Sequence, residues 1–236
     1  MDSTMKYAPR LVLSSVLSLV LVAGCKKKDD PEPAPVASTG TPQVPAPDAV
    51  LRAKVRWSST LPEQHSGTAY FGSGLGDLST MTSVELNGLP LVDAFDPGFY
   101  TIADGGLDLS NNTATWDVIG DNGFPSFTRQ NDEIVFPLTD PITSPLIVDK
   151  SDGYTLTCTA VGSADSVAFS VGFVRKVLPG NAASCHFSSA DLDGLFPTSA
   201  FTVQISGITY RTETIGDKRI RFEKERAWAE PVTIVE

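Results

Sequence analysis

Residues 51–57 read Leu51-Arg52-Ala53-Lys54-Val55-Arg56-Trp57, a run in which apolar and basic side chains alternate without a break. Successive side chains of a β-strand point to opposite faces of a sheet, so this pattern predicts a strand that buries one face. The same period recurs further on, where Tyr154, Leu156 and Cys158 alternate with threonines. The sequence therefore predicts an all-β protein beyond about residue 50.

Turn signals divide this region into short strands. The pairs Asn87-Gly88 and Gly216-Asp217 suit tight hairpin turns, which need positive φ angles. Near the end of the chain, we expect four separate strands at residues 200–205, 209–215, 218–226 and 231–235. One short helical turn is expected after Ser188, which can cap it, and Gly194 can end it.

The domain organisation follows from what lies between the strands. No helical pattern recurs there, which argues against a parallel α/β sheet and favours antiparallel β-sandwiches. A proline cluster at Pro137, Pro141 and Pro145 marks a boundary. We therefore expect two antiparallel β-sandwich (Ig-like) domains, at residues 50–138 and 143–236. One continuous larger sandwich is the alternative, because no repeat aligns the two halves.

The first 25 residues carry an export pattern. Lys6 and Arg10 precede an apolar run at residues 11–22, which is shorter than the ~20 residues that a bilayer span needs. The stretch Leu21-Val22-Ala23-Gly24-Cys25 resembles the lipobox of bacterial lipoproteins. The resemblance implies cleavage before Cys25, a diacylglycerol on its thiol, and a mature protein anchored to a membrane. An uncleaved transmembrane anchor and an ordinary signal peptide are the alternatives.

We accordingly expect residues 1–24 to be a lipoprotein signal peptide and residues 25–49 a Pro-rich disordered tether. The tether has almost nothing to bury and cannot offset its ordering entropy. Proline keeps such a segment extended, at roughly 3.1 Å per residue. The charged run at residues 26–30 is similar to the export signal of Bacteroidetes-type surface lipoproteins. This resemblance implies an outer membrane lipoprotein on the cell surface, with the periplasmic face as the alternative.

The charge balance limits the partners. The chain has 18 Lys and Arg against 28 Asp and Glu, a formal net charge of −10, and the acidic excess lies after the tether. An acidic domain of this kind argues against nucleic-acid binding.

The cysteines suggest a cross-link. Lipidation would use Cys25 and leave Cys158 and Cys185 as a pair in an oxidising compartment, which predicts one disulfide. Both cysteines are expected to face inward on neighbouring strands. Closing a loop of this length would stabilise the fold by ~3 kcal/mol in the chain-entropy model. Two separate buried thiols are the alternative.

Motifs for catalysis and metal binding are weak. His65 and His186 fall in different expected domains, and neither has a second histidine at ligand spacing. The run Asp191-Leu192-Asp193-Gly194 offers two carboxylates before a glycine, but helix capping explains it better than calcium binding. The glycine-rich stretch at residues 72–76 lacks a nucleophile elbow or a phosphate loop and indicates a turn. We predict no catalytic residue, metal site or cofactor.

Aromatic residues offer another route to function. Trp57 and Trp116 share strand faces with aliphatic residues, so we expect both in the core, whereas Trp228 is unassigned between the core and a sugar-stacking platform. The tripeptide Asp165-Ser166-Val167 resembles the acceptor of Bacteroidetes-type O-glycosylation and is expected at a turn. The resemblance implies modification at Ser166, with a chance match as the alternative.

Two functions from different classes follow. The preferred hypothesis is a non-enzymatic binding module, displayed on the tether, that engages an envelope protein, a host surface or a glycan. The alternative is a carbohydrate-active accessory protein or glycosidase. Clustered aromatics on a concave face, or two facing carboxylates, would favour the alternative.

Overall fold

The described part of the protein is almost entirely β-structure, as the alternating patterns predict. The computed structural model describes residues 45–72, 78–94, 98–103 and 105–236. The predicted signal peptide, the lipobox with Cys25, the tether up to residue 44 and most of the glycine-rich stretch lie outside the described residues. Within them, no helix is long and apolar enough to cross a membrane.

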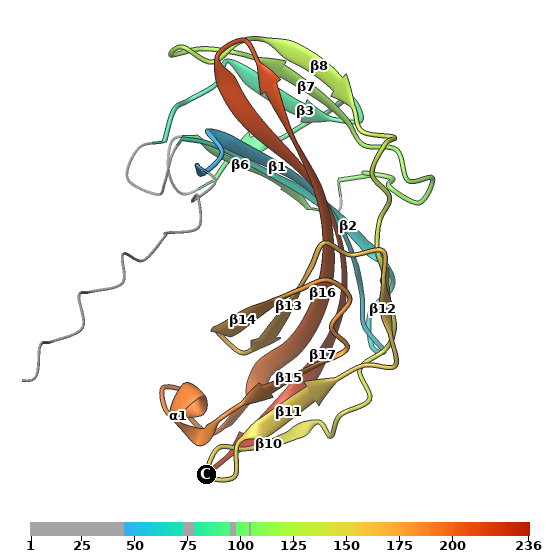
Figure 1. Ribbon diagram of the computed structural model, residues 1–236, viewed down its shortest axis with the longest axis vertical. Helices are drawn as coiled ribbons and strands as arrows, with labels where there is room; N and C mark the ends of the chain where they lie inside the picture. The colour runs from blue at the N-terminus through green and yellow to red at the C-terminus, as the bar shows by residue number, and fades with distance from the viewer. Residues whose placement is uncertain (1–44, 73–77, 95–97, 104) are drawn as a thin grey trace, which may run out of the picture. The chain divides into compact units, whose positions relative to one another are not determined.

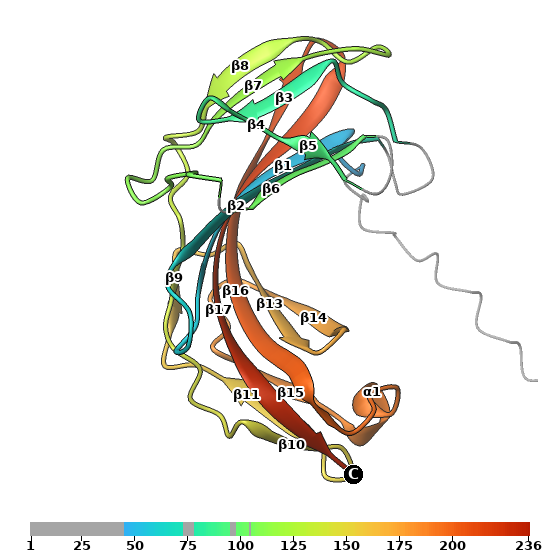
Figure 2. The ribbon, with the colours of Figure 1, turned by 180° about the vertical axis from the view of Figure 1, so that it is seen from behind.

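One large sheet organises the described residues (Figures 1 and 2). Its strands, in spatial order, are β14 (Val174–Pro179), β13 (Ser166–Val171), β16 (Thr198–Ile215), β17 (Lys218–Val235), β1 (Ala49–Trp57), β2 (Gln64–Phe71), β6 (Phe99–Ala103) and β5 (Val92–Asp93), with β10 (Ile147–Asp149) also pairing with β17. We call it the main sheet.

Three smaller sheets and one helical turn complete the described fold. The first contains β4 (Leu89–Pro90), β3 (Ser83–Leu86), β7 (Thr115–Ile119) and β8 (Phe127–Gln130). The other two pair β11 (Tyr154–Thr157) with β15 (Ser184–Phe187), and β12 (Val161–Gly162) with β9 (Leu138–Thr139). The helical turn is α1 (Ser189–Leu192), and its capping box between Ser188 and Asp191 confirms the predicted start.

A hairpin of two 18-residue strands, β16 and β17, forms the centre of the main sheet. Its turn lies at Gly216 and Asp217, as predicted, with Gly216 at φ +63° and Ile215 opposite Lys218. The prediction of four separate strands is wrong, because pairing continues through Gly207, which lies opposite Arg226. A Cβ atom on Gly207 would lie 2.9 Å from Thr139 Oγ1. The glycine therefore permits a close approach within a strand rather than a turn.

The main sheet joins strands from both expected domains. β1 lies beside β17 in parallel register, with Leu51 next to Phe222, and residues 44–236 form one compact unit. The parallel pairing also departs from a purely antiparallel expectation. The all-β prediction is confirmed, but two separate Ig-like domains are not confirmed.

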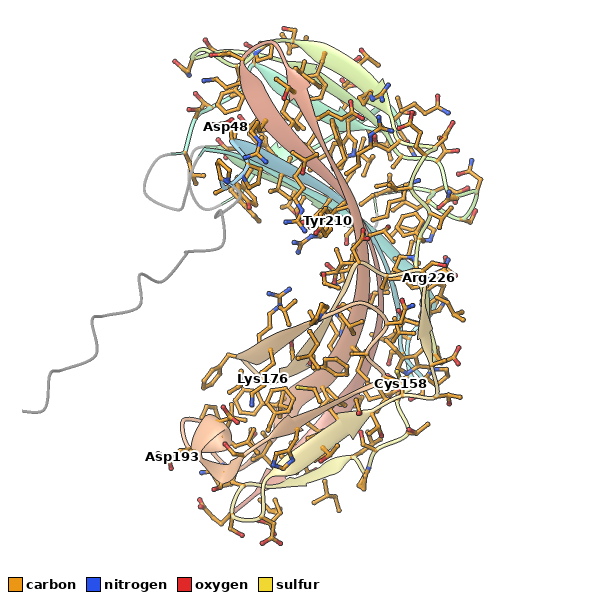
Figure 3. The ribbon with its side chains drawn as sticks, viewed as in Figure 1. Asp48, Cys158, Lys176, Asp193, Tyr210 and Arg226 are labelled. Atoms are coloured by element: carbon orange, nitrogen blue, oxygen red, sulfur yellow. The ribbon has the colours of Figure 1, made fainter. Side chains whose placement is uncertain are left out.

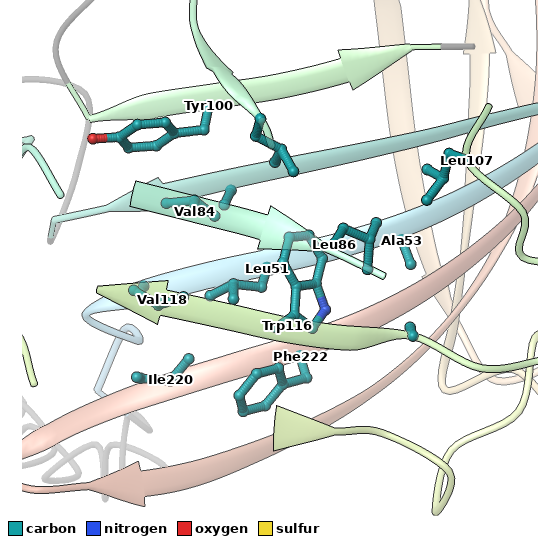
Figure 4. Close-up of a cluster of buried hydrophobic side chains, with 14 of the residues drawn as sticks. Leu51, Ala53, Val84, Leu86, Tyr100, Leu107, Trp116, Val118, Ile220 and Phe222 are labelled. Carbon is teal, nitrogen blue, oxygen red and sulfur yellow. The ribbon is translucent and has the colours of Figure 1, made fainter. Parts of the chain in front are cut away.

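Two hydrophobic cores pack against the main sheet. In the first core, Trp116 is fully buried beside Leu86 of the neighbouring strand, and both pack against the main sheet, whose core residues include Leu51 and Phe222 (Figure 4). Its place confirms the core prediction for this tryptophan. The second core packs the β11–β15 pair against β13, β16 and β17; its fully buried members include Leu156, Phe169, Phe187, Val203 and Ile205. Each core thus lies between the main sheet and a smaller sheet.

The folded part begins before the expected end of the tether. The backbone N–H of Asp48 donates to the carbonyl of Arg219 at 2.8 Å, and Asp48 Oδ2 accepts from the Arg219 N–H at 2.8 Å. Ala49 is completely buried at the start of β1. The last two residues of the expected 25–49 tether therefore belong to the fold.

Candidate functional site

Cys158 and Cys185 are buried but are not joined by a disulfide. Leu156 lies opposite Cys185, and the N–H of Cys158 donates to the carbonyl of Ala183 at 3.0 Å. The cysteines are therefore diagonal neighbours, and diagonal Cα atoms lie about 7–8 Å apart, beyond the roughly 6.8 Å that a disulfide spans. The disulfide prediction is wrong, and burial raises the pKa of the Cys158 thiol to about 11.

The two histidines have separate structural partners. His65 Nε2 lies 2.7 Å from Glu63 Oε1, and its Nδ1 lies 2.9 Å from the Leu107 carbonyl. His186 Nδ1 lies 3.1 Å from Thr155 Oγ1. Within the part of the chain that the structure describes, no three His, Cys, Asp or Glu side chains gather as metal ligands.

The acidic pair at α1 has a capping role. Asp191 Oδ2 accepts a hydrogen bond from the Ser188 backbone at 2.7 Å and from Lys176 Nζ at 2.6 Å. The Lys176 ammonium and the Ser188 donors lower the pKa of Asp191 to about 2. These contacts explain the position of Asp191 without a calcium ion. Asp193 occupies the C-cap position of α1.

Trp57 and Trp228 lie next to each other across β1 and β17. Trp57 packs partly buried against the first core, and the guanidinium of Arg226 lies 4.7 Å from its ring centroid. Trp228 is half-buried, and its indole N–H donates to Glu230 Oε1 at 2.6 Å. Both rings therefore have intramolecular partners.

An open cleft lies on the face of the main sheet that points away from both cores. Its volume is about 290 Å³. The polar lining consists of Arg52, Tyr70, Ser166, Arg175, Arg221 and Glu223, and the apolar lining consists of Pro47, Val50, Val177 and Ile208. We call it the arginine cleft. The strand alternation explains its position, because Leu51 and Phe222 fill the core whereas their neighbours point the other way.

Ser166 is part of this lining. It is the first residue of β13 and lies half-buried between Pro179 and Ile208 on the neighbouring strands. The expectation that Ser166 lies at a turn is wrong, since it is paired on both sides. Its modification stays a prediction.

A buried carboxylate orients two arginines at the cleft. Glu223 is 5% exposed. Its Oε2 accepts a hydrogen bond from Arg52 Nε at 2.6 Å, and its Oε1 lies 2.9 Å from Arg221 Nε. The guanidinium of Arg221 also stacks at 3.6 Å from the ring centroid of Tyr210, which Figure 3 labels midway along the long hairpin. Both arginines are thus fixed in orientation before any ligand arrives.

A second buried carboxylate extends this network. Glu225 Oε1 lies 2.7 Å from Lys54 Nζ, and its Oε2 lies 3.3 Å from Arg52 Nη1. Burial opposes ionisation of Glu225, but Lys54 and Arg52 outweigh it and hold the pKa of Glu225 below its usual value. Burial likewise opposes the charge on Arg52, and Glu225 and Glu223 outweigh it and raise the pKa of Arg52. Both shifts favour the charged forms of Glu225 and Arg52.

The opposite face of β17 carries a different buried charge. Lys224 is 0% exposed. Its Nζ donates to the backbone carbonyls of Asn112 and Asn131 at 2.6 Å and of Ile134 at 2.8 Å. Burial lowers the pKa of Lys224 to about 8, although Asp132 opposes this effect. This lysine fastens two loops to the hairpin.

Sequence reasoning did not identify the arginine cleft. A signal exists, since Arg52 and Lys54 alternate on β1 and Glu223 and Glu225 alternate on β17 with the opposite charge. The two runs lie 171 residues apart, and only the pairing of β1 with β17 brings them together. Neither a scan against protein-family models nor a search of curated proteins finds a match for this chain.

Proposed function

We propose that the protein is an envelope lipoprotein whose β-structure acts as a non-enzymatic binding module. In this proposal, Cys25 carries the lipid, the residues after it up to about residue 44 form the tether, and the folded part is displayed from the outer membrane, on its cell-surface side. The lipobox resemblance supports the anchor, and the charged run behind Cys25 supports the location.

One observation carries the binding role, namely the arginine cleft on the open face of the main sheet. Buried carboxylates hold two of its arginines, Arg52 and Arg221, and sites built on strands are more precise than sites on loops. Apolar side chains beside these donors give the cleft the mixed lining that is usual for ligand sites.

The anchor is tested by Cys25→Ser in the full-length chain. We expect the wild type to sediment with membranes and the variant to appear in the soluble fraction, because a lipid chain supplies the membrane affinity. Cys185→Ala serves as the cysteine control and should sediment like the wild type. Unchanged sedimentation of Cys25→Ser would overturn the anchor.

The binding role is tested by capture from envelope extracts and by a glycan array, with the full-length chain as bait. We expect a saturable ligand that is lost in Arg175→Ala, which alters the cleft. Arg211→Ala is the matched control, because Arg211 lies on the other face of β16, where it pairs with Glu133 and Glu213. Equal capture by both variants would place binding outside the cleft. Conversion of a bound glycan to product would contradict the non-enzymatic role.

A carbohydrate-active accessory protein is the second candidate, and an exposed aromatic group favours it. Phe173 and Phe196 are 65% and 60% exposed. Both rings pack on Phe201, with centroid distances of 5.9 and 5.0 Å. Aromatic faces of this kind can stack on sugar rings. Loss of array binding in Phe173→Ser, with Arg175→Ala unaffected, would favour this candidate.

We further propose that the two cores act as two sandwich-like lobes, at residues 50–138 and 143–236, which share the β16–β17 hairpin. The packing of each core between the main sheet and a smaller sheet supports this arrangement. If both lobes share the hairpin, neither should be stable without it. Release by limited proteolysis of a stable fragment that contains one lobe and lacks the hairpin would contradict this arrangement.

A further inference from the structure

The arginine cleft contains guanidinium donors that no acceptor in the described part of the chain uses. Glu223 accepts a hydrogen bond from Arg52 Nε and forms an ion pair with Arg221, whose Nε lies 2.9 Å from Glu223 Oε1. A guanidinium has five N–H groups, so most of the donors on Arg221 remain. Within the described residues, the side chain of Arg175 makes no hydrogen bond or ion pair, and the Nη atoms of Arg221 make none either. The cleft therefore presents guanidinium donors that lack acceptors among these residues.

The charge of the cleft favours an anion. The ion-pair network and the cleft lining together contain four cations and two carboxylates, namely Arg52, Lys54, Arg175, Arg221, Glu223 and Glu225. This local excess of positive charge occurs in a chain with a net charge of −10. Guanidinium groups bind the two oxygens of a carboxylate in a bidentate way. The two buried glutamates disfavour a doubly charged phosphate more than a singly charged carboxylate.

The remaining lining favours a ring beside the anionic group. Val50, Val177 and Ile208 supply apolar contact, and Tyr70 adds a half-buried aromatic ring. The volume of about 290 Å³ lies at the lower end of ligand pockets, which span roughly 300–1,000 Å³. A single sugar ring fits this space better than an extended chain. Ser166 adds a hydroxyl that can pair with a sugar hydroxyl.

We propose that the arginine cleft binds the carboxylate of an acidic sugar, a residue of the uronic acid type. The carboxylate lies between Arg175 and Arg221, and the sugar ring packs on Tyr70 and Ile208. Glu223 is a positioning residue that holds Arg52 and Arg221 toward the ligand. This inference rests on the proposed binding function and specifies its ligand.

Isothermal titration calorimetry of the full-length chain in detergent tests the proposal with three probes: glucuronic acid, glucose and glucose 6-phosphate. We expect glucuronic acid to bind at least tenfold more tightly than the other two. Arg175→Ala should weaken binding of glucuronic acid about tenfold, the effect of losing one charged hydrogen bond. Arg211→Ala should bind as the wild type does. Higher salt should weaken the interaction.

Three results would overturn the inference: no binding of glucuronic acid, preference for glucose or glucose 6-phosphate, or equal binding by the wild type and Arg175→Ala. These results are distinguishable from failure of the proposed function. A protein or neutral glycan that is captured by the wild type and lost in Arg175→Ala would leave the binding module intact and overturn only the acidic sugar. Arg175 is exposed, so its loss should leave the fold unchanged.

Discussion

Both faces of β17 carry buried charged side chains, but these side chains have different kinds of partner. Glu223 and Glu225 point toward the arginine cleft and accept from cationic side chains, whereas Lys224 points toward the loops beside the first core and donates to backbone carbonyls. All three are at most 5% exposed. The partners of the glutamates are a quarter to a third exposed, while those of Lys224 are carbonyls within the fold.

The two kinds of partner indicate two roles for a buried charge: one stabilises the fold, and the other orients neighbouring side chains. A buried charge with backbone partners fixes the chain, and its removal leaves those partners without donors. A buried charge with partly exposed side-chain partners sets their direction, and its removal lets them turn to water. Stability should therefore depend more on Lys224, and ligand binding more on the glutamates.

The largest expected effect is that of Lys224→Met. This change leaves the carbonyls of Asn112, Asn131 and Ile134 without their shared donor, so we expect a loss of about 3 kcal/mol in the free energy of unfolding. Urea denaturation measures it. Lys218→Met is the control, because Lys218 lies at the hairpin turn beside the exposed Asp217, and it should cost less than about 1 kcal/mol. Equal losses in both variants would remove the distinction.

Glu225→Gln comes next, with an expected loss of about 2 kcal/mol at pH 7. The cost is smaller because Arg52 and Lys54 can reach solvent when the carboxylate is lost. The folded state lowers the pKa of Glu225, so its stabilisation is full above the unfolded pKa of about 4.3 and is lost as the pH falls through the folded pKa. The difference in urea midpoint between wild type and variant should therefore narrow below about pH 4. A constant difference from pH 7 to pH 3 would contradict this coupling.

A smaller effect concerns alkaline pH. The folded pKa of Lys224 is about 8 and its ordinary value is 10.5, so the unfolded chain holds more protons between these values. Stability should rise with pH from about 8 to 9.5, by at most about 1.4 kcal/mol per unit. In Lys224→Met, the part of this increase in the free energy of unfolding that Lys224 contributes should be absent. Burial raises the pKa of Tyr70 and Tyr100 above the ordinary value of 10, so these two groups titrate above this window.

The smallest effect on stability belongs to Arg175→Ala, which should change the free energy of unfolding by less than about 0.5 kcal/mol. Arg175 is exposed on the edge strand β14 and makes no ion pair among the described residues. The urea midpoint should match that of the wild type while ligand binding falls. A large shift in the midpoint would mean that the cleft side chain supports the fold.

Local features of this fold were predictable. Asn87-Gly88 and Gly216 adopt the positive φ angles that their turns require, and the capping box at Ser188 starts α1. The expected break between residues 205 and 209 contains Gly207, which serves a close approach to Thr139 within a continuous strand rather than a turn. The register of β11 with β15 keeps Cys158 and Cys185 apart, and their separation in the sequence does not reveal this register.

The cleft was not predictable for a related reason. Arg52 shows its strand face in the sequence, but its partner Glu223 lies 171 residues away. Charged residues at every second position are usual on the solvent-facing side of a strand. Only the strand order, which places β1 beside β17, brings the charged residues of the two strands together as ion pairs. The Cys25 anchor stays a prediction from the lipobox, since it lies outside the described residues.

The parallel pairing of β1 with β17 also sets the order in which the protein can fold. The pairing joins residues that lie 171 positions apart in the chain, and Leu51 needs Phe222 beside it. Contacts of such long sequence separation slow folding, because a long loop must close first. β1 therefore cannot complete its pairing until the distant strand β17 lies beside it.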